Sequence, residues 1–296
     1  MKGPTGMSDL PHPAEHAAET SWQRFWNKGG WWKSVLVAAV YIAIYLLLGF
    51  LINNVSGTKP ENVLSDPLSV FFGLAVPILV MGALTYLFIC SLGWTKEIFG
   101  KQPVTGRWWM WIAVVLVLIP NVMHLVATNW SAYSVALVLA ILFLGLCVGF
   151  SEELLTRGVA VNLLRRAEHT ERSVMLLSAT IFGLLHSSNI VSGQNPITVG
   201  ITVLYTFGFG AMMYLSMRAT GSIIWAILLH ASTDPSTILA TGGIDAHSGN
   251  SGDAGIIAIA GFFNYAYILA ALVAIFLVRG KVDQERSPRK HPVSKE

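Results

Sequence analysis

The stretch SAYSVALVLAILFLGLCVGFSEELLTRGVAVNLLRR, residues 131–166, decides the fold class of this chain. Its first twenty residues carry no charge, which is the length and composition that a helix needs to cross a bilayer. A polar stretch follows, and the chain then turns mainly apolar again until Arg165 and Arg166. We therefore predict one long membrane helix that ends at this arginine pair. The alternative is a helix that ends at Phe150 and leaves the charges behind it at the membrane surface.

Seven further segments are long and apolar enough to cross a membrane. They are residues 34–52, 68–92, 108–129, 173–190, 197–217, 221–240 and 256–278. The whole chain is 54% hydrophobic and only 12% charged, against about 25% charged residues in soluble domains. This composition excludes a soluble or secreted protein. It predicts an all-α polytopic membrane protein with about eight transmembrane helices.

The basic residues predict how these helices are oriented. If the chain begins in the cytoplasm, every Lys and Arg except Lys59 falls in a cytoplasmic segment or at the cytoplasmic end of a helix. Cytoplasmic loops of membrane proteins are enriched in these residues. We therefore expect an even number of spans and both termini in the cytoplasm. If the protein is bacterial, we expect it in the inner (cell) membrane.

The segments of the chain have different predicted tasks. The predicted order is a cytoplasmic segment at 1–33, three accessory helices at 34–129, a catalytic core at 130–240, an outer loop and last helix at 241–278, and a basic cytoplasmic tail at 279–296. The first segment contains no apolar core ahead of a cleavage site, so we expect no cleaved signal peptide. It ends in an aromatic cluster of Trp22, Phe25, Trp26, Trp31 and Trp32. Indole rings favour the membrane interface, so we expect this cluster to lie on the cytoplasmic leaflet.

Ionisable residues within the apolar segments are costly and are therefore the candidate functional residues. Glu153 and Arg157 are four residues apart, with the acid first, which is the favourable order for an ion pair on a helix. Glu152 is rotated by about 100° from its neighbour and faces elsewhere. We expect one carboxylate to be held by the arginine and the other to be available.

Two histidine motifs lie on later spans. His186 follows Phe182 by four residues, and His230 precedes Asp234 by four, so that each pair shares a helix face. A lone histidine in a span is more often an interior polar group, and that alternative stands for His186. Counted from the basic end of each helix, Glu152, His186 and His230 all lie roughly 18–21 Å deep. We therefore predict that three helices bring these groups to one level.

A carboxylate and two imidazoles around a water-filled cavity can hydrolyse a peptide bond. Glu152 would act as the general base that activates water. His186 and His230 would supply hydrogen bonds to the developing oxyanion. The pair of Glu153 and Arg157 would keep the helix face turned inward.

These motifs resemble those of the CPBP family, the CAAX-protease and bacteriocin-processing membrane proteins also called ABI proteins. The matching positions are Glu152, Glu153 and Arg157 for EExxxR, Phe182 and His186 for FxxxH, His230 and Asp234 for HxxxN or HxxxD, and Asn189 for a common bacterial extension of the second motif. Order, spacing and placement on successive helices all agree. The resemblance covers about residues 130–240, and no single motif in it would be specific alone.

The resemblance implies an intramembrane glutamic endopeptidase whose helical core opens toward the cytoplasm. Glu152 would be its base, Glu153 and Arg157 the support, and the two histidines with Asp234 the oxyanion and water-positioning groups. Many members carry Asn where this chain has Asp234. Either this carboxyl is protonated, or it orients His230 by accepting a hydrogen bond, and we favour the second.

Other readings of the same residues stay open. Zinc could be held by Glu152, His186, His230 and Asp234, although we expect no cofactor. A scaffold or bacteriocin-immunity protein would use the motifs without catalysis, and a transporter would use them as an ion site. His124, beside Pro120 and Asn121 in the third span, is expected to mark a helix kink rather than a catalytic group.

The expected partners are the lipid bilayer and a membrane-associated peptide or protein substrate. That substrate could carry a CAAX-type prenyl group or a leader peptide, and the sequence does not distinguish them. We expect no nucleic-acid binding, because the basic residues follow topology. The oligomeric state is left open.

Overall fold

The computed structural model describes residues 19–56, 64, 66–242 and 252–282. The early part of the 1–33 segment, Lys59, most of the outer loop at 241–255 and most of the 279–296 tail lie outside these described residues. The helices are α1 (Ser21–Asn27), α2 (Trp31–Ser56), α3 (Pro67–Val70), α4 (Val76–Leu92), α5 (Thr95–Phe99), α6 (Trp111–Ala127), α7 (Val135–Glu153), α8 (Val161–Arg166), α9 (Glu171–Leu185), α10 (Pro196–Thr220), α11 (Ile223–Thr241) and α12 (Ala254–Leu277). Short π or 3₁₀ turns are η2 (Phe71–Ala75), η3 (Trp108–Met110), η4 (Trp130–Ala132), η5 (Leu154–Ala160) and η6 (His186–Ile190).

Eight helical segments within the described residues are long and apolar enough to cross a membrane. They run over Trp31–Ile52, Pro67–Leu92, Trp108–Ala127, Val135–Arg166, Glu171–Ile190, Pro196–Thr220, Ile223–Thr241 and Ala254–Leu277. Each matches a predicted span to within a few residues. The all-α polytopic membrane fold is therefore confirmed. The helix that carries the two glutamates continues through η5 and α8 to Arg166, as predicted, and does not end at Phe150.

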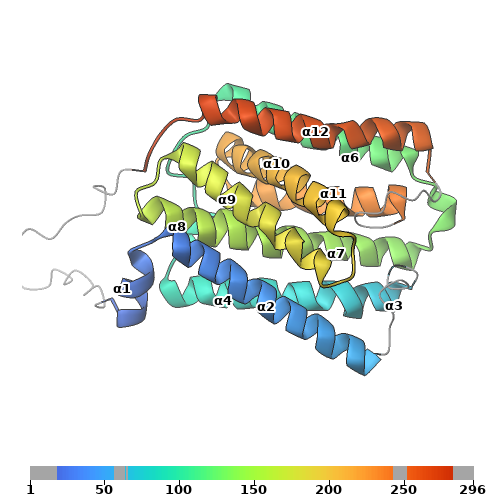
Figure 1. The fold of residues 1–296 in the computed structure, drawn as a ribbon, viewed down its shortest axis with the longest axis horizontal. Coiled ribbons are helices and arrows are strands. Elements are labelled where there is room, and N and C mark those ends of the chain that lie inside the picture. The colour runs from blue at the N-terminus through green and yellow to red at the C-terminus, as the bar shows by residue number, and fades with distance from the viewer. Residues whose placement is uncertain (1–18, 57–63, 65, 243–251, 283–296) are drawn as a thin grey trace, which may run out of the picture.

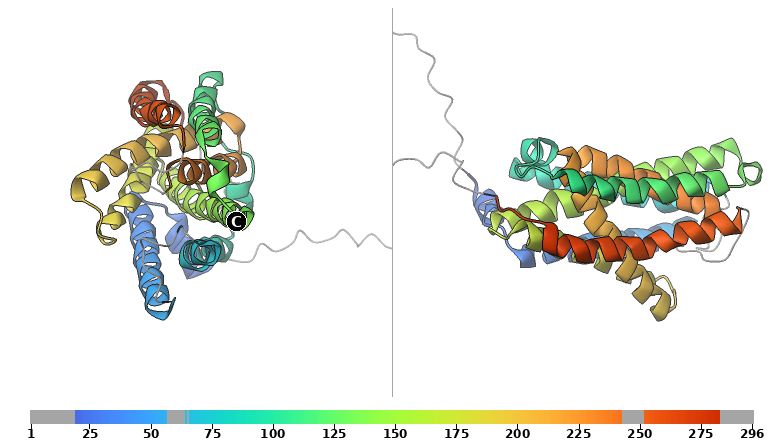
Figure 2. Two further views of the ribbon diagram at one scale, coloured as in Figure 1. Left: turned by 90° about the vertical axis from the view of Figure 1, so that its right-hand side faces the viewer. Right: turned by 90° about the horizontal axis from the view of Figure 1, so that it is seen from above.

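The helices form three rows in Figure 1, with α12 and α6 along one side, α2 and α4 along the other, and α7, α9, α10 and α11 between them. In the most apolar 18-residue stretch of each helix, 61% of the residues of α11 and 56% of those of α10 are buried, against 11% of those of α2. The middle row is therefore the core, and the outer helices present their apolar side chains to lipid. In Figure 2, the hairpin of α9, η6 and the start of α10 projects from the bundle between α2 and α12.

Helix ends coincide with local capping residues. Thr170, Asn195 and Ser222 each accept a hydrogen bond from a backbone N–H in the first turn of the helix that follows. Gly221 and Gly242 end α10 and α11 with positive φ angles of 76° and 81°. The breaks between spans are thus set by residues that favour a helix start or stop.

Close contact between α7 and α11 depends on Gly145 and Gly149, which lie on one face of α7. A Cβ atom added at Gly149 would lie 2.6 Å from the Ile227 carbonyl oxygen and 2.7 Å from the Ala231 nitrogen. One added at Gly145 would lie 2.6 Å from the Ala231 carbonyl oxygen. Small residues four apart allow membrane helices to meet backbone to backbone. This contact sets the distance between the glutamates of α7 and the HASTD motif of α11.

The basic end of the bundle is closed by a buried ion-pair network. Glu171 at the start of α9 contacts Arg165 of α8 and Arg218 of α10 at 2.7 and 2.8 Å, and Tyr214 also donates to it. Arg165 reaches Gln102 in the loop after α5 at 2.8 Å. Three helices and one loop are thus joined where α1 and the end of α12 also lie (Figure 1).

The aromatic cluster before the first span divides into two groups. Trp22, Phe25, Trp31 and Trp32 are exposed, as expected of an interfacial segment. Trp26 is 6% exposed, and its ring centroid lies 5.0 Å from that of Phe88 in α4. This indole is a core residue that attaches α1 to the bundle, because α1 forms a short helix and one of its faces must turn inward.

Candidate active site

Glu153 is the held carboxylate. Its Oε1 lies 3.2 Å from Nη1 of Arg157 and 2.8 Å from Nδ1 of His230, and its side chain is fully buried. The predicted pair with Arg157 is therefore present. Its Oε2 has no hydrogen-bond partner among the described residues. Glu153 thus links α7 to α11 through Oε1, while Oε2 accepts no hydrogen bond from the described residues.

Glu152 is the open carboxylate. Its side chain is 21% exposed and lines a large cavity. Its Oε2 lies 4.0 Å from Nε2 of His230. The two adjacent acids therefore face the two nitrogens of one imidazole, with different exposure. Glu152 is the only one of the two that lines the cavity.

The turn that follows the glutamates is a π-helix, η5. Such wide turns occur often at functional sites, because they reset the direction of side chains on an otherwise regular helix. Within it Arg157 is buried, and its Nη2 donates to the Gly210 carbonyl of α10 at 2.6 Å. Its guanidinium lies 4.7 Å from the centroid of the Phe182 ring. Arg157 thus joins α7, α9 and α10 behind the glutamates.

Phe182 lies between the two histidines. Its ring centroid is 5.2 Å from that of His186 and 5.6 Å from that of His230. The Nδ1 of His186 lies 3.1 Å from the Phe182 carbonyl oxygen. A carbonyl only accepts, so Nδ1 carries the proton and Nε2 is the ring nitrogen left for the cavity. Phe182 thus contacts both histidines of the site.

His230 is 3% exposed and sits in an aromatic enclosure, with the Phe209 centroid at 5.0 Å. Because Glu153 accepts at Nδ1, Nε2 is the nitrogen directed toward Glu152. The sequence suggested Asp234 as the group that orients this ring, and did not identify the contact with Glu153. Asp234 and Asn189 both line the cavity, and their roles stay predictions.

The structure thus brings the sequence-predicted residues to one cavity of about 1010 Å³. Glu152, Phe182, His186, Asn189, His230 and Asp234 line its wall. Glu153 and Arg157 lie directly behind Glu152 and do not line it.

Many cavity residues were not indicated by the motifs, and several of them come from α2, α6, α10 and α12. They include Tyr41 and Tyr45 of α2, His124 of α6, Tyr205 of α10 and Tyr265 of α12. Nδ1 of His124 lies 3.5 Å from the hydroxyl oxygen of Thr237 on α11. Its polarity inside an apolar span was the available signal. The tyrosines carry no such signal, because aromatic residues are common in lipid-facing helices.

The cavity extends toward the end of the bundle opposite the basic end. Its lining extends from Glu152 and His230 along α11 to Thr241 and along α12 to Ala254, away from the basic end. The basic end, predicted to be cytoplasmic, is closed by the network around Glu171. Whether the cavity opens toward the cytoplasm stays a prediction. Salt bridges at the ends of α8, α9 and α10 hold those helices together, whereas the α9–α10 hairpin splays apart from the bundle at the other end (Figure 2).

A metal ion does not fit this arrangement well. The described residues contain no group of three or more His, Cys, Asp and Glu side chains that could hold one. The hydrolysis proposed below uses no zinc ion.

Comparison with known proteins gives one family. Residues 134–235 match the family described as type II CAAX prenyl endopeptidase, Rce1-like. No curated protein matches the chain at a significant level. The matched region contains all of the motif residues, from Glu152 to Asp234, and it covers the helices α7 to α10 and the first part of α11. Residues 134–235 of this chain are therefore similar to the Rce1-like family of CAAX proteases, and the predicted resemblance to the CPBP family is confirmed.

Proposed function

We propose that this protein is an intramembrane endopeptidase in which Glu152 activates water to cleave a membrane-associated polypeptide. The family match supports a hydrolase of the CAAX-protease type. One observation carries the finer assignment to Glu152. Of two adjacent acids, Glu153 is buried and bound by Arg157 and His230, while Glu152 faces a cavity large enough for a peptide segment.

Glu152 acts first as a base. It takes a proton from a water molecule, and the oxygen of that water attacks the carbonyl carbon of the scissile bond. The neutral form of His186 presents the lone pair of Nε2 to the cavity, where it accepts a hydrogen bond from the same water. The tetrahedral intermediate collapses when the protonated Glu152 delivers its proton to the leaving nitrogen. Atoms and charges balance without a metal.

The oxyanion of the intermediate needs hydrogen-bond donors that are already in place. In its doubly protonated form His230 donates through Nε2 while Nδ1 stays bound to Glu153. The contact with Glu153 prevents the ring from turning, which removes an orientational cost at the moment of reaction. Asp234, one turn further along α11, acts beside it as a positioning group on the cavity wall.

The cavity favours an apolar substrate. Besides the site it is walled by Tyr41, Tyr45, Leu204 and Phe209, with few charges. An isoprenoid on a CAAX-type C-terminus or the apolar stretch of a leader peptide would bury its surface there. Because the lining extends away from the basic end, the substrate approaches from the opposite end or from the side of the α9–α10 hairpin. We further propose that both termini are cytoplasmic.

Terminus mapping tests the proposal. Protein termini are compared between membranes of cells that produce wild type, Glu152→Gln or Glu168→Gln at equal levels. Glu168 is an exposed acid that pairs with Lys281 far from the cavity, so its variant is the matched control. New termini with wild type and Glu168→Gln, and none with Glu152→Gln, are expected. Identical termini in all three, with each protein folded, would overturn the protease assignment in favour of a binding scaffold.

A further inference from the structure

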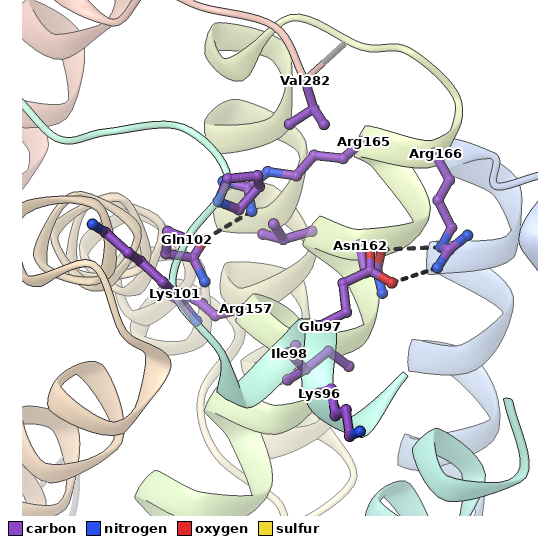
Figure 3. A pocket seen from close by; sticks show the side chains of 13 residues that line it. Lys96, Glu97, Ile98, Lys101, Gln102, Arg157, Asn162, Arg165, Arg166 and Val282 are labelled. Carbon is purple, nitrogen blue, oxygen red and sulfur yellow. Dashed lines mark hydrogen bonds and ion pairs between the residues drawn. The ribbon is translucent and has the colours of Figure 1, made fainter. Parts of the chain in front are cut away.

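A second pocket lies at the basic end of the bundle, separate from the cavity (Figure 3). It holds about 420 Å³, which is within the range of small-molecule sites. Its polar walls come from α5, the following loop, η5 and α8. The polar residues are Lys96, Glu97, Lys101, Gln102, Arg157, Asn162, Arg165 and Arg166.

Positive charge exceeds negative charge in this pocket. Arg166 is bound to Glu97 at 2.5 Å, and Arg165 to Glu171 behind the wall at 2.7 Å. Lys96 and Lys101 are exposed and form no ion pair among the described residues. The two ammonium groups at the mouth are therefore uncompensated by any acid of the described chain.

Two buried hydrogen-bond donors in the wall also lack partners. Asn162 is 5% exposed, and Arg166 donates to its Oδ1 at 3.1 Å, which fixes the orientation of the amide. Its Nδ2 then has no hydrogen-bond partner within the described part of the chain. The Nε of Arg157, which is 2% exposed, has none either. A buried donor without a partner costs roughly 1–3 kcal/mol, and a bound anion would remove that cost.

The pocket lies at the level where lipid headgroups are expected. Gly30, at the start of α2, donates to the Leu163 carbonyl of α8, so the exposed indoles of Trp31 and Trp32 lie at the same end as this pocket. Trp108, at the start of η3, is 84% exposed at the same end. Indoles gather at the headgroup layer, where the most abundant anion is the lipid phosphate.

We propose that this pocket binds the phosphate of an anionic phospholipid headgroup. Lys96 and Lys101 attract the phosphate, and Asn162 and the inner guanidinium groups donate to its oxygens. The acceptors of the wall are already bound, because Arg166 donates to Glu97 and to the Asn162 amide oxygen and Arg165 donates to the Gln102 amide oxygen. The donors that remain suit an anion better than a cationic headgroup. The pocket shares Arg157 with the support of Glu153, but lipid binding here is measured without any cleavage and does not rest on the proposed protease activity.

The test uses the full chain purified in detergent and four forms of it. Wild type is compared with the Lys96→Gln/Lys101→Gln double variant and with Asn162→Leu, which removes the buried donor without changing charge. The matched control is Lys28→Gln/Arg107→Gln, which removes the same charge at the same end from exposed positions outside the pocket. Binding of dihexanoyl phosphatidylglycerol, dihexanoyl phosphatidylcholine and inorganic phosphate is titrated separately by calorimetry.

Wild type and the control should bind the phosphatidylglycerol probe within about twofold of each other, because Lys28 and Arg107 do not line the pocket. Each pocket variant should bind the same probe about tenfold more weakly than wild type. The melting temperature of the Lys96→Gln/Lys101→Gln variant should be unchanged, because both lysines are exposed. If the control variant bound the phosphatidylglycerol probe as weakly as the pocket variants, or if Asn162→Leu bound it as tightly as wild type, the probe would not bind in this pocket. Its binding would then reflect a general attraction to the basic surface. Inorganic phosphate that binds as tightly as the lipid probe, with the same dependence on the variants, would overturn the lipid source. Equal binding of the phosphatidylcholine probe would overturn the selectivity for anionic lipid.

Discussion

Two fully buried glutamates, Glu153 beside the cavity and Glu171 at the basic end, are bound to different extents. Glu171 uses both oxygens, with two contacts to Arg165, one to Arg218 and one from Tyr214. Glu153 uses only Oε1, which Arg157 and His230 share, and its Oε2 has no partner among the described residues.

This difference distinguishes the structural ion pairs of Glu171 from the ion pair of Glu153 with Arg157 in the candidate active site. Around Glu171 two guanidinium groups and a hydroxyl satisfy one carboxylate, so the helices there are held together. Around Glu153 a second acid, Glu152, stands within 4.0 Å of the same imidazole and faces the cavity. An incompletely satisfied polar cluster inside a membrane is costly, and groups retained at such a cost are typical of function.

The largest expected effect comes from Glu152. Changing Glu152→Gln removes the base while keeping the shape of the side chain, and we expect cleavage to fall by about 10²–10⁴-fold. The melting temperature of the purified protein should change little, since Glu152 holds no helix pair together. Cleavage of the substrate found by terminus mapping, together with thermal unfolding in detergent, measures both. A variant that keeps more than a tenth of the activity would remove Glu152 as the base.

The converse is expected for Glu171. Changing Glu171→Gln leaves Arg165 and Arg218 buried without their acid, and breaking a buried pair costs roughly 3–5 kcal/mol. We expect a large fall in melting temperature, with near-normal cleavage per folded molecule at low temperature. If activity falls while stability is unchanged, the distinction between the two glutamates is wrong.

A smaller effect should follow from separating α7 and α11. Gly149→Ala places a methyl group against the backbone of Ile227 and Ala231, and overpacking of this kind costs roughly 1–3 kcal/mol. The shift also lengthens the contact between Glu153 and His230, so cleavage should fall more than stability alone explains. Gly49→Ala is the control, because no atom lies within 4 Å of its added Cβ. Equal behaviour of the two variants in unfolding and cleavage assays would show that the close approach is dispensable.

The smallest effect is expected for Asp234→Asn. Glu153 already holds Nδ1 of His230, and the amide keeps the shape of the side chain with one oxygen acceptor. Loss of a single neutral hydrogen bond is worth about 0.5–1.5 kcal/mol, so cleavage should stay within about tenfold of wild type. Asp234→Leu, which removes both oxygens, should be lower than Asp234→Asn. If Asp234→Asn lost as much activity as Glu152→Gln, the carboxyl group of Asp234 would be essential for cleavage, and the minor positioning role proposed for it would be wrong.

Much of the site could be predicted because it depends on contacts along single helices. The pair of Glu153 and Arg157 follows from a spacing of four residues, and it survives the local change to a π-turn. The common depth of Glu152, His186 and His230 follows from the rise per residue of a helix, and all three reach one cavity. The hydrogen bond between His230 and Glu153 could not be predicted from helical spacing, because it depends on the distance between α7 and α11.

What the sequence by itself determined is the membrane fold, the eight spans and the identity of the polar residues at depth. Apolar length, capping residues and helical spacing are local properties, and each acts within about twenty residues of chain. Only the tertiary structure decided that Trp26 belongs to the core, that α2 and α6 contribute cavity walls and that the cavity extends away from the basic end. These outcomes depend on how closely helices distant in sequence approach one another. The glycines of α7 and the ion pairs of Glu171 set that approach through contacts that no single segment contains.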